Sequence, residues 1–258
     1  MLSSLKKQGV LFCYALSFFS RLPVPQSINF KTFPFHLGNA YFPVVGLLYA
    51  LTCFVVYYAS QFVFDNTISV ILMLVAGMLF TGCLHEDGFA DSCDGFGGGY
   101  NKKQCLAIMK DSQIGTYGVL GLIILLALKI NVLSTLADNQ HITFVGMLIS
   151  AAIVSRFSVL CLMQYSEYAR DDQSSKSITS SQHLPMKYFI AALLFSLLAM
   201  SWIPLIWCLL IITVVIASTL LCRAYFYKQI AGYTGDCLGF LQQLNELLIL
   251  LILILFLK

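Results

Sequence analysis

The sequence predicts an all-α protein, a polytopic bundle of about seven transmembrane helices preceded by an N-terminal helix at the membrane interface. Apolar residues make up 59% of the 258 residues and charged residues only 10%, whereas soluble domains carry about 25% charged residues. The mean hydropathy is +0.84. Several apolar runs approach the roughly 20 residues that a helix needs to cross a bilayer. We therefore interpret residues 1–258 as a single integral-membrane catalytic domain.

The expected helices follow from these runs in chain order. An apolar stretch from residue 9 to 19 is too short to cross. No small-residue cleavage site follows it, so it predicts an interfacial or partly inserted helix rather than a signal peptide. The long run 188–222 predicts two short spans with a tight turn near 201–204, since proline suits the first turn of a new helix. The predicted spans lie within residues 39–60, 67–84, 114–136, 142–164, 188–222 and 241–257.

The distribution of basic residues orients the seven spans. With the N-terminus in the cytoplasm, the outer loops near 61–66, 137–141 and 201–203 contain no Lys or Arg. This asymmetry follows the positive-inside rule and places the polar loops on the cytoplasmic side. One of them, from 165 to 187, is expected to be flexible and to cover a ligand. Twelve of the fifteen basic residues then lie inside: Lys6, Lys7, Arg21, Lys31, Lys102, Lys103, Lys110, Arg170, Lys176, Lys187, Arg223 and Lys228.

An acidic segment, residues 85–111, holds five of the twelve acidic residues. Asp87, Asp91 and Asp94 have the spacing i, i+4 and i+7, which puts three carboxylates on one stripe of a helix. Like charges on one face repel, and a hard divalent cation with oxygen ligands, most simply Mg²⁺, would relieve the repulsion. Asp111 follows a glycine run that lets the chain turn back, so it is a candidate fourth ligand.

Carboxylates at the cytoplasmic end of a span favour metal-assisted phosphoryl transfer, in which Mg²⁺ neutralises charge on the phosphates. His85 and Glu86 precede the acidic stripe, and either could act as a base or orient another group. Lys110 could contact a phosphate, although it is equally well read as an ordinary cytoplasmic-face lysine.

A second polar cluster directly precedes the last span. Residues 232–239 contain three glycines together with Thr234 and Asp236. Such a loop can approach a phosphate closely, but a turn between two helices uses the same residue types.

Three ionisable residues lie inside predicted spans. Such groups are costly in a bilayer and usually face the bundle interior or a partner. Arg156 and Glu246 could pair with each other or contact substrate. Lys129 lies nearer the outer end of its span and is expected to snorkel to the interface.

Two stretches of the acidic region resemble the signature of the cobalamin synthase (adenosylcobinamide-GDP ribazoletransferase) family. They are the pattern His-x-Asp-Gly-x-Ala-Asp-x-x-Asp-Gly at 85–95 and the pattern Ile-Met-Lys-Asp-Ser-x-x-Gly-x-x-Gly at 108–118. Glu86 and the three-glycine run look like local variations of little consequence. The resemblance extends in order along nearly the whole chain, with further blocks at 19–25, 42–46, 128–129, 155–156 and 234–246.

The resemblance implies a Mg²⁺-dependent enzyme of the bacterial cytoplasmic (inner) membrane. Such an enzyme joins adenosylcobinamide-GDP to α-ribazole, or to α-ribazole 5′-phosphate, and releases GMP. Membrane lipids would surround it, no nucleic-acid partner is expected, and a homo-oligomer is an open alternative. Its metal ligands would be Asp87, Asp91, Asp94 and Asp111, and one of these or His85 would take the hydroxyl proton. The expected substrate contacts are Lys110, Arg156, Thr234, Asp236 and Glu246.

Two other classes compete with this interpretation. A CDP-alcohol phosphotransferase also uses spaced aspartates, and residues 91–95 match the start of its signature, but the Ala-Arg pair and the final double aspartate are absent. A cation transporter would need carboxylates near the bilayer midplane and related halves. The acids here cluster at one predicted surface, and the sequence shows no repeat.

Overall fold

The computed structural model describes residues 2–139, 141–169 and 183–256. The predicted all-α class is confirmed, since these residues form helices and no strand. The helices are α1 (Leu2–Phe19), the 3₁₀ helix η1 (Phe35–Tyr41), α2 (Phe42–Ser60), α3 (Asn66–Thr81), α4 (Leu84–Gly98), α5 (Lys102–Ile108), α6 (Thr116–Asn139), α7 (His141–Gln164), α9 (Met186–Ala199), α10 (Leu205–Ile230) and α11 (Gly235–Phe256).

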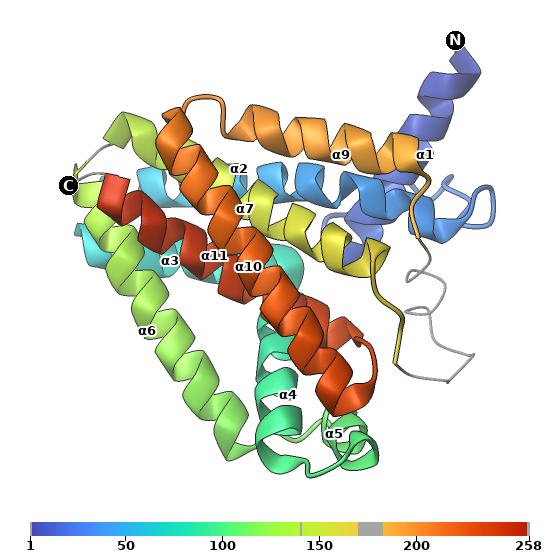
Figure 1. Cartoon of the computed structure of the whole chain (residues 1–258). Coiled ribbons are helices and arrows are strands. Elements are labelled where there is room, and N and C mark those ends of the chain that lie inside the picture. Colours follow the sequence, from blue (N-terminus) through green and yellow to red (C-terminus); the bar gives the residue numbers. More distant parts are fainter. Residues whose placement is uncertain (1, 140, 170–182, 257–258) are drawn as a thin grey trace.

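Helix α11 occupies the middle of the bundle. It packs against α4, α6, α7 and α10, while α2 packs against α3 and α7. Figure 1 shows α2 and α7 running across the molecule, with α6 and α10 as long oblique helices. The central position of α11 explains why polar side chains on it can meet partners from several other helices.

The sequence predicts about seven spans. Among the residues that the structure describes, five helices are long and apolar enough to cross a membrane, and a bent pair formed by α3 and α4 would make a sixth. Helix α9 has 14 residues, which is short for a full crossing. The predicted turn at 201–204 is confirmed, because Pro204 immediately precedes α10. However, α10 has 26 residues rather than forming a short span.

The predicted span 67–84 ends in a sharp bend that hydropathy does not reveal. Helix α3 stops at Thr81, and α4 begins at Leu84 at an angle of 89° to it. Gly82 and Cys83 make the corner with left-handed φ angles of 66° and 59°. Glycine adopts this conformation at no steric cost, whereas the side chain of Cys83 makes the same conformation strained. The bend turns the acidic helix α4 away from the axis of α3 (Figure 1).

Helix α1 is longer than the predicted stretch 9–19, and it is not among the helices that pass as candidate spans. It packs against η1, where Leu11, Tyr14 and Leu37 form a small separate core. The Tyr14 hydroxyl donates to the Asn29 carbonyl oxygen at 2.8 Å, which ties the following loop to the helix. Residues 170–182 of the polar loop 165–187 lie outside the described part of the chain. Most of the segment that was expected to cover a ligand therefore lies outside it as well.

The outer faces of the long helices are apolar. Leu120, Ile123 and Ile124 are exposed on α6, and Leu220 and Leu221 are exposed on α10. Exposed patches of this extent are rare on soluble monomers, whereas lipid-facing helices require them. The chain is therefore a multi-pass membrane protein.

Candidate functional site

The acidic helix α4 is held against the start of α11 by two glycines. A Cβ atom at Gly88 would lie 3.0 Å from the Cα of Asp236, and one at Gly239 would lie 2.9 Å from the backbone oxygen of His85. Only hydrogen at these positions allows the two helices to approach so closely. The crossing brings Asp236 of the second polar cluster beside Asp87 and His85 of the acidic segment.

These residues line one cavity of about 150 Å³. Asp87 is exposed and Asp236 is half-buried, so both carboxylates lie toward its open side. His85 is only 3% exposed, and neither of its ring nitrogens has a hydrogen-bond partner in the described part of the chain. The other lining residues are Phe18, Phe19, Phe42, Leu84, Gly88, Val159, Met163, Tyr168, Tyr233, Gly235, Leu238 and Gly239.

Asp94 is buried and serves the start of the next long helix. Its two carboxylate oxygens accept the backbone N–H groups of Gly115 at 2.7 Å and of Gly118 at 2.8 Å. Gly115 immediately precedes α6 and Gly118 lies in its first turn, where N–H groups lack partners within the helix. Side chains at either glycine would collide with the carboxylate. The spacing Gly-x-x-Gly at 115–118 therefore fits a cap supplied from α4.

The remaining sequence-predicted acids do not join Asp87 in a closed cage. Asp91 is half-buried one turn farther along α4. Asp111 is exposed in the connection after α5, where its carboxylate accepts the backbone N–H of Gln113 at 3.0 Å, and Lys110 beside it is also exposed. Within residues 2–139, 141–169 and 183–256, no group of three His, Cys, Asp or Glu side chains forms a metal-binding cluster.

The donor set nevertheless fits Mg²⁺ in its chemistry. At sites that bind phosphate-containing substrates, magnesium is often held by only one or two carboxylates, with waters and substrate phosphates completing the coordination shell. Asp87 and Asp91 offer oxygen donors on one side of α4, and the exposure of Asp87 leaves room for a phosphate.

Thr234 holds the local geometry of the second polar cluster. Its hydroxyl accepts the backbone N–H of Cys237 at 3.3 Å and lies 3.1 Å from the Asp236 carboxylate, to which it can donate. It therefore caps the start of α11 in the manner of a Ser/Thr N-cap. Thr234 is buried, so among these neighbours Asp236 is the side chain nearer the open part of the cavity.

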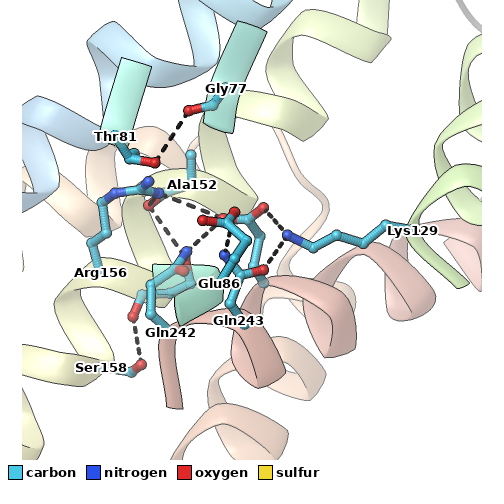
Figure 2. Close-up of polar contacts among 11 residues, drawn as sticks. Gly77, Thr81, Glu86, Lys129, Ala152, Arg156, Ser158, Gln242 and Gln243 are labelled. Carbon is cyan, nitrogen blue, oxygen red and sulfur yellow. Dashed lines mark hydrogen bonds and ion pairs between the residues drawn. The ribbon is translucent and has the colours of Figure 1, made fainter. Parts of the chain in front are cut away.

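A buried network of charges is centred on Glu246 of α11 (Figure 2). The Lys129 ammonium of α6 donates to Glu246 Oε1 at 2.7 Å, and Arg156 Nη1 of α7 lies 3.5 Å from Glu246 Oε2. Gln242 Nε2 also donates to Glu246 Oε2, at 2.6 Å. The Arg156 guanidinium stacks over the Tyr49 ring with its carbon 4.5 Å from the ring centre. Of the two alternatives that the sequence left open for Arg156 and Glu246, the structure shows their pairing.

The expectation that Lys129 snorkels is wrong. Its side chain is 2% exposed and points inward to Glu246 and to Gln243 Oε1, at 2.6 Å. A lysine surrounded by carboxylate and amide oxygens lies at lower energy than one facing lipid alone, which explains the inward orientation. Ionisable residues in spans usually face the interior of the bundle. The position of Lys129 within a span was therefore a signal for a buried partner.

Glu86 connects this network to the acidic helix. Gln243 Nε2 donates to Glu86 Oε1 at 3.0 Å, while Glu86 Oε2 is buried without a hydrogen-bond partner in the described part of the chain. Glu86 is therefore more than a local variation of little consequence. Gln242 and Gln243 were missed by sequence reasoning, although two adjacent amides in an apolar helix are themselves a signal for an interior polar contact.

The comparisons with known proteins agree along the whole chain. The family profile described as cobalamin-5-phosphate synthase matches residues 11–254. A protein of Pseudoalteromonas atlantica named adenosylcobinamide-GDP ribazoletransferase is 40% identical over 97% of this chain and 93% of its own length. Proteins with the same name from Vibrio cholerae and Shewanella frigidimarina are 40% and 36% identical, and cover 100% and 93% of this chain and 98% and 92% of their own lengths. No solved structure matches.

Proposed function

The chain belongs to the cobalamin-5-phosphate synthase family, and from this premise we propose that it is an adenosylcobinamide-GDP ribazoletransferase acting late in cobalamin synthesis. The full-length match to enzymes of that name carries the proposal. It also favours this activity over a CDP-alcohol phosphotransferase or a cation transporter. The substrates are adenosylcobinamide-GDP and α-ribazole or its 5′-phosphate, and the membrane is the bacterial inner membrane with the site on its cytoplasmic side.

The reaction exchanges a phosphoanhydride bond for a phosphate ester bond. A ribose hydroxyl of α-ribazole attacks the phosphorus on the cobinamide side of the diphosphate. The bond from that phosphorus to the bridging oxygen breaks, and GMP leaves with the electron pair. Mg²⁺, when bound, supplies positive charge to the phosphates.

We assign different parts of this step to the residues around the cavity. Asp87 and Asp91 hold the metal and position the diphosphate, with Asp111 and Lys110 as further contacts from the connection after α5. Asp236 orients the ribose at the cavity mouth. His85 takes the hydroxyl proton, because it lines the same cavity and its ring nitrogens have no hydrogen-bond partner in the described part of the chain. Asp94, Thr234, Arg156 and Glu246 hold these groups in place through the contacts described above.

Purified protein incubated with adenosylcobinamide-GDP and α-ribazole tests this proposal. GMP release is expected with Mg²⁺ and is expected to stop when a chelator removes the metal. Asp91→Asn should lower GMP release about a hundredfold or more, since loss of metal-bound charge stabilisation is worth several kcal/mol. Asp65→Asn is the matched control, because Asp65 caps α3 and asparagine also caps helices.

Two results would contradict the proposal. GMP release that is unchanged by the chelator would exclude the metal assignment. Near-normal turnover in Asp91→Asn, with Asp65→Asn also active, would exclude Asp91 from the metal site.

A further inference from the structure

The cavity beside Asp87 and Asp236 has walls that are unsuited to phosphate. Its inner part is formed by aromatic and aliphatic side chains, among them Phe19, Phe42, Val159 and Met163. The Phe19 and Phe42 rings stack with centroids 3.9 Å apart. A cavity of about 150 Å³ with apolar walls is known to hold one benzene-sized ring. The inner part therefore suits a flat, apolar aromatic group.

Two lining residues, Tyr168 and Tyr233, are held in a defined position by a short backbone clamp. Ala169 N–H donates to the Tyr233 carbonyl oxygen at 2.8 Å, and Tyr233 N–H donates to the Glu167 carbonyl oxygen at 3.0 Å. The rings of Tyr168 and Tyr233 meet edge to face at 5.5 Å. Gly232 permits the close approach of the two segments, since its φ is 154° and a Cβ there would lie 2.5 Å from the Glu167 oxygen.

Two lining residues, Tyr168 and His85, carry polar atoms that have no hydrogen-bond partner in the described part of the chain. The Tyr168 hydroxyl and both ring nitrogens of His85 are buried in this state. The charged side chains of the lining are Asp87 and Asp236, and the rest of it is mainly apolar.

We propose that this cavity binds the benzimidazole base of α-ribazole. The inference rests on the proposed function. The ribose then emerges at the open side, next to His85, Asp87 and Asp236, where its hydroxyl must react. Guanine fits this cavity less well, because apolar walls would leave its several polar edge groups unpaired. The corrin macrocycle is far larger than the cavity.

Filling the cavity from α7 provides the first test. Val159→Phe adds a ring inside it, whereas the control Cys161→Phe adds the same ring to a separate apolar cavity on the other side of the helix. Val159→Phe is expected to raise the KM for α-ribazole about tenfold or more and to leave the KM for adenosylcobinamide-GDP within about twofold, as one lost aromatic contact of roughly 1.4 kcal/mol predicts. Cys161→Phe should leave both constants unchanged.

The result separates this inference from the proposed function. A wild-type enzyme that releases GMP, with an unchanged KM for α-ribazole in Val159→Phe, would overturn the base pocket alone. A wild-type enzyme that releases no GMP would overturn the function, and the pocket is then judged by the labelling experiment.

Photolabelling of the wild-type chain does not depend on a variant that folds. An azidobenzimidazole riboside, activated by light on the full-length protein in detergent, should label Val159, Met163 or Tyr168, as located by mass spectrometry. An excess of free 5,6-dimethylbenzimidazole should suppress the labelling. Labelling confined to other segments, or insensitive to the free base, would overturn the proposal.

Discussion

At the residue scale, three aspartates on one helical stripe have three different environments. Asp87 is exposed at the cavity, Asp91 is half-buried, and Asp94 is buried against the first turn of α6. Both oxygens of Asp94 accept backbone N–H groups, so much of its hydrogen-bonding capacity is used within the fold. Helical spacing in the sequence thus predicts a common face but not a common role.

Asp94→Asn tests this division of roles. The amide nitrogen of asparagine cannot accept a hydrogen bond, so one of the N–H groups of Gly115 and Gly118 would lose its partner. The expected loss is about 1–3 kcal/mol of unfolding free energy, measured as a lower thermal midpoint in detergent. The exposed Asp111→Asn is the control and should unfold like the wild type. Equal midpoints in the two variants would show that Asp94 does not stabilise the start of α6.

At the scale of elements, the bundle is joined by charge as well as by apolar packing. Glu246 of α11 pairs with Lys129 of α6 and with Arg156 of α7, and the Gln243 side chain extends the network to Glu86 of α4. Removing one partner of a buried ion pair leaves an uncompensated charge, which costs about 3–5 kcal/mol. Glu246 and its two cations are unequal in this respect, because either cation can be removed while the other still neutralises Glu246.

A double-mutant cycle tests this network, and its two single variants are expected to lose unequal amounts of stability. Glu246→Gln leaves two buried cations and should destabilise the protein more than Lys129→Met, after which Arg156 still pairs with Glu246. The double variant should recover part of the loss, because only one unpaired cation remains. Denaturant unfolding in detergent measures all three, with the exposed Lys103→Met as control. Additive losses would contradict direct coupling between the two residues.

At the scale of the whole molecule, the distribution of basic residues predicts that α4 and its cavity face the cytoplasm. Impermeant maleimide labelling of intact spheroplasts checks this orientation in a Cys83→Ser background, since Cys83 is the exposed native thiol among the described cysteines. Phe62→Cys, between α2 and α3, should be labelled in intact cells. Tyr100→Cys, after α4, should be labelled only after permeabilisation. Both sites are highly exposed, at 77% and 94%, so the reverse pattern would invert the topology.

The fold class and the approximate places of the apolar helices could be predicted from the amino-acid sequence alone, and the acidic segment could be singled out as a candidate site. Hydropathy and charge spacing are local properties, and they can be read without knowing how helices pack. The motif resemblance likewise pointed to the family that the comparisons confirm. The span count was less secure, because α3 and α9 are apolar but short.

Three features could be known only from the three-dimensional structure: the corner at Gly82, the cap that Asp94 provides, and the inward direction of Lys129. Lys129 and Glu246 are 117 positions apart in the chain, and their contact exists because α6 and α11 pack side by side. The meeting of Asp87 with Asp236 has the same origin, since it requires the close glycine crossing of α4 and α11. Contacts between distant residues depend on how helices cross, and that geometry is set by packing in three dimensions rather than by local pattern.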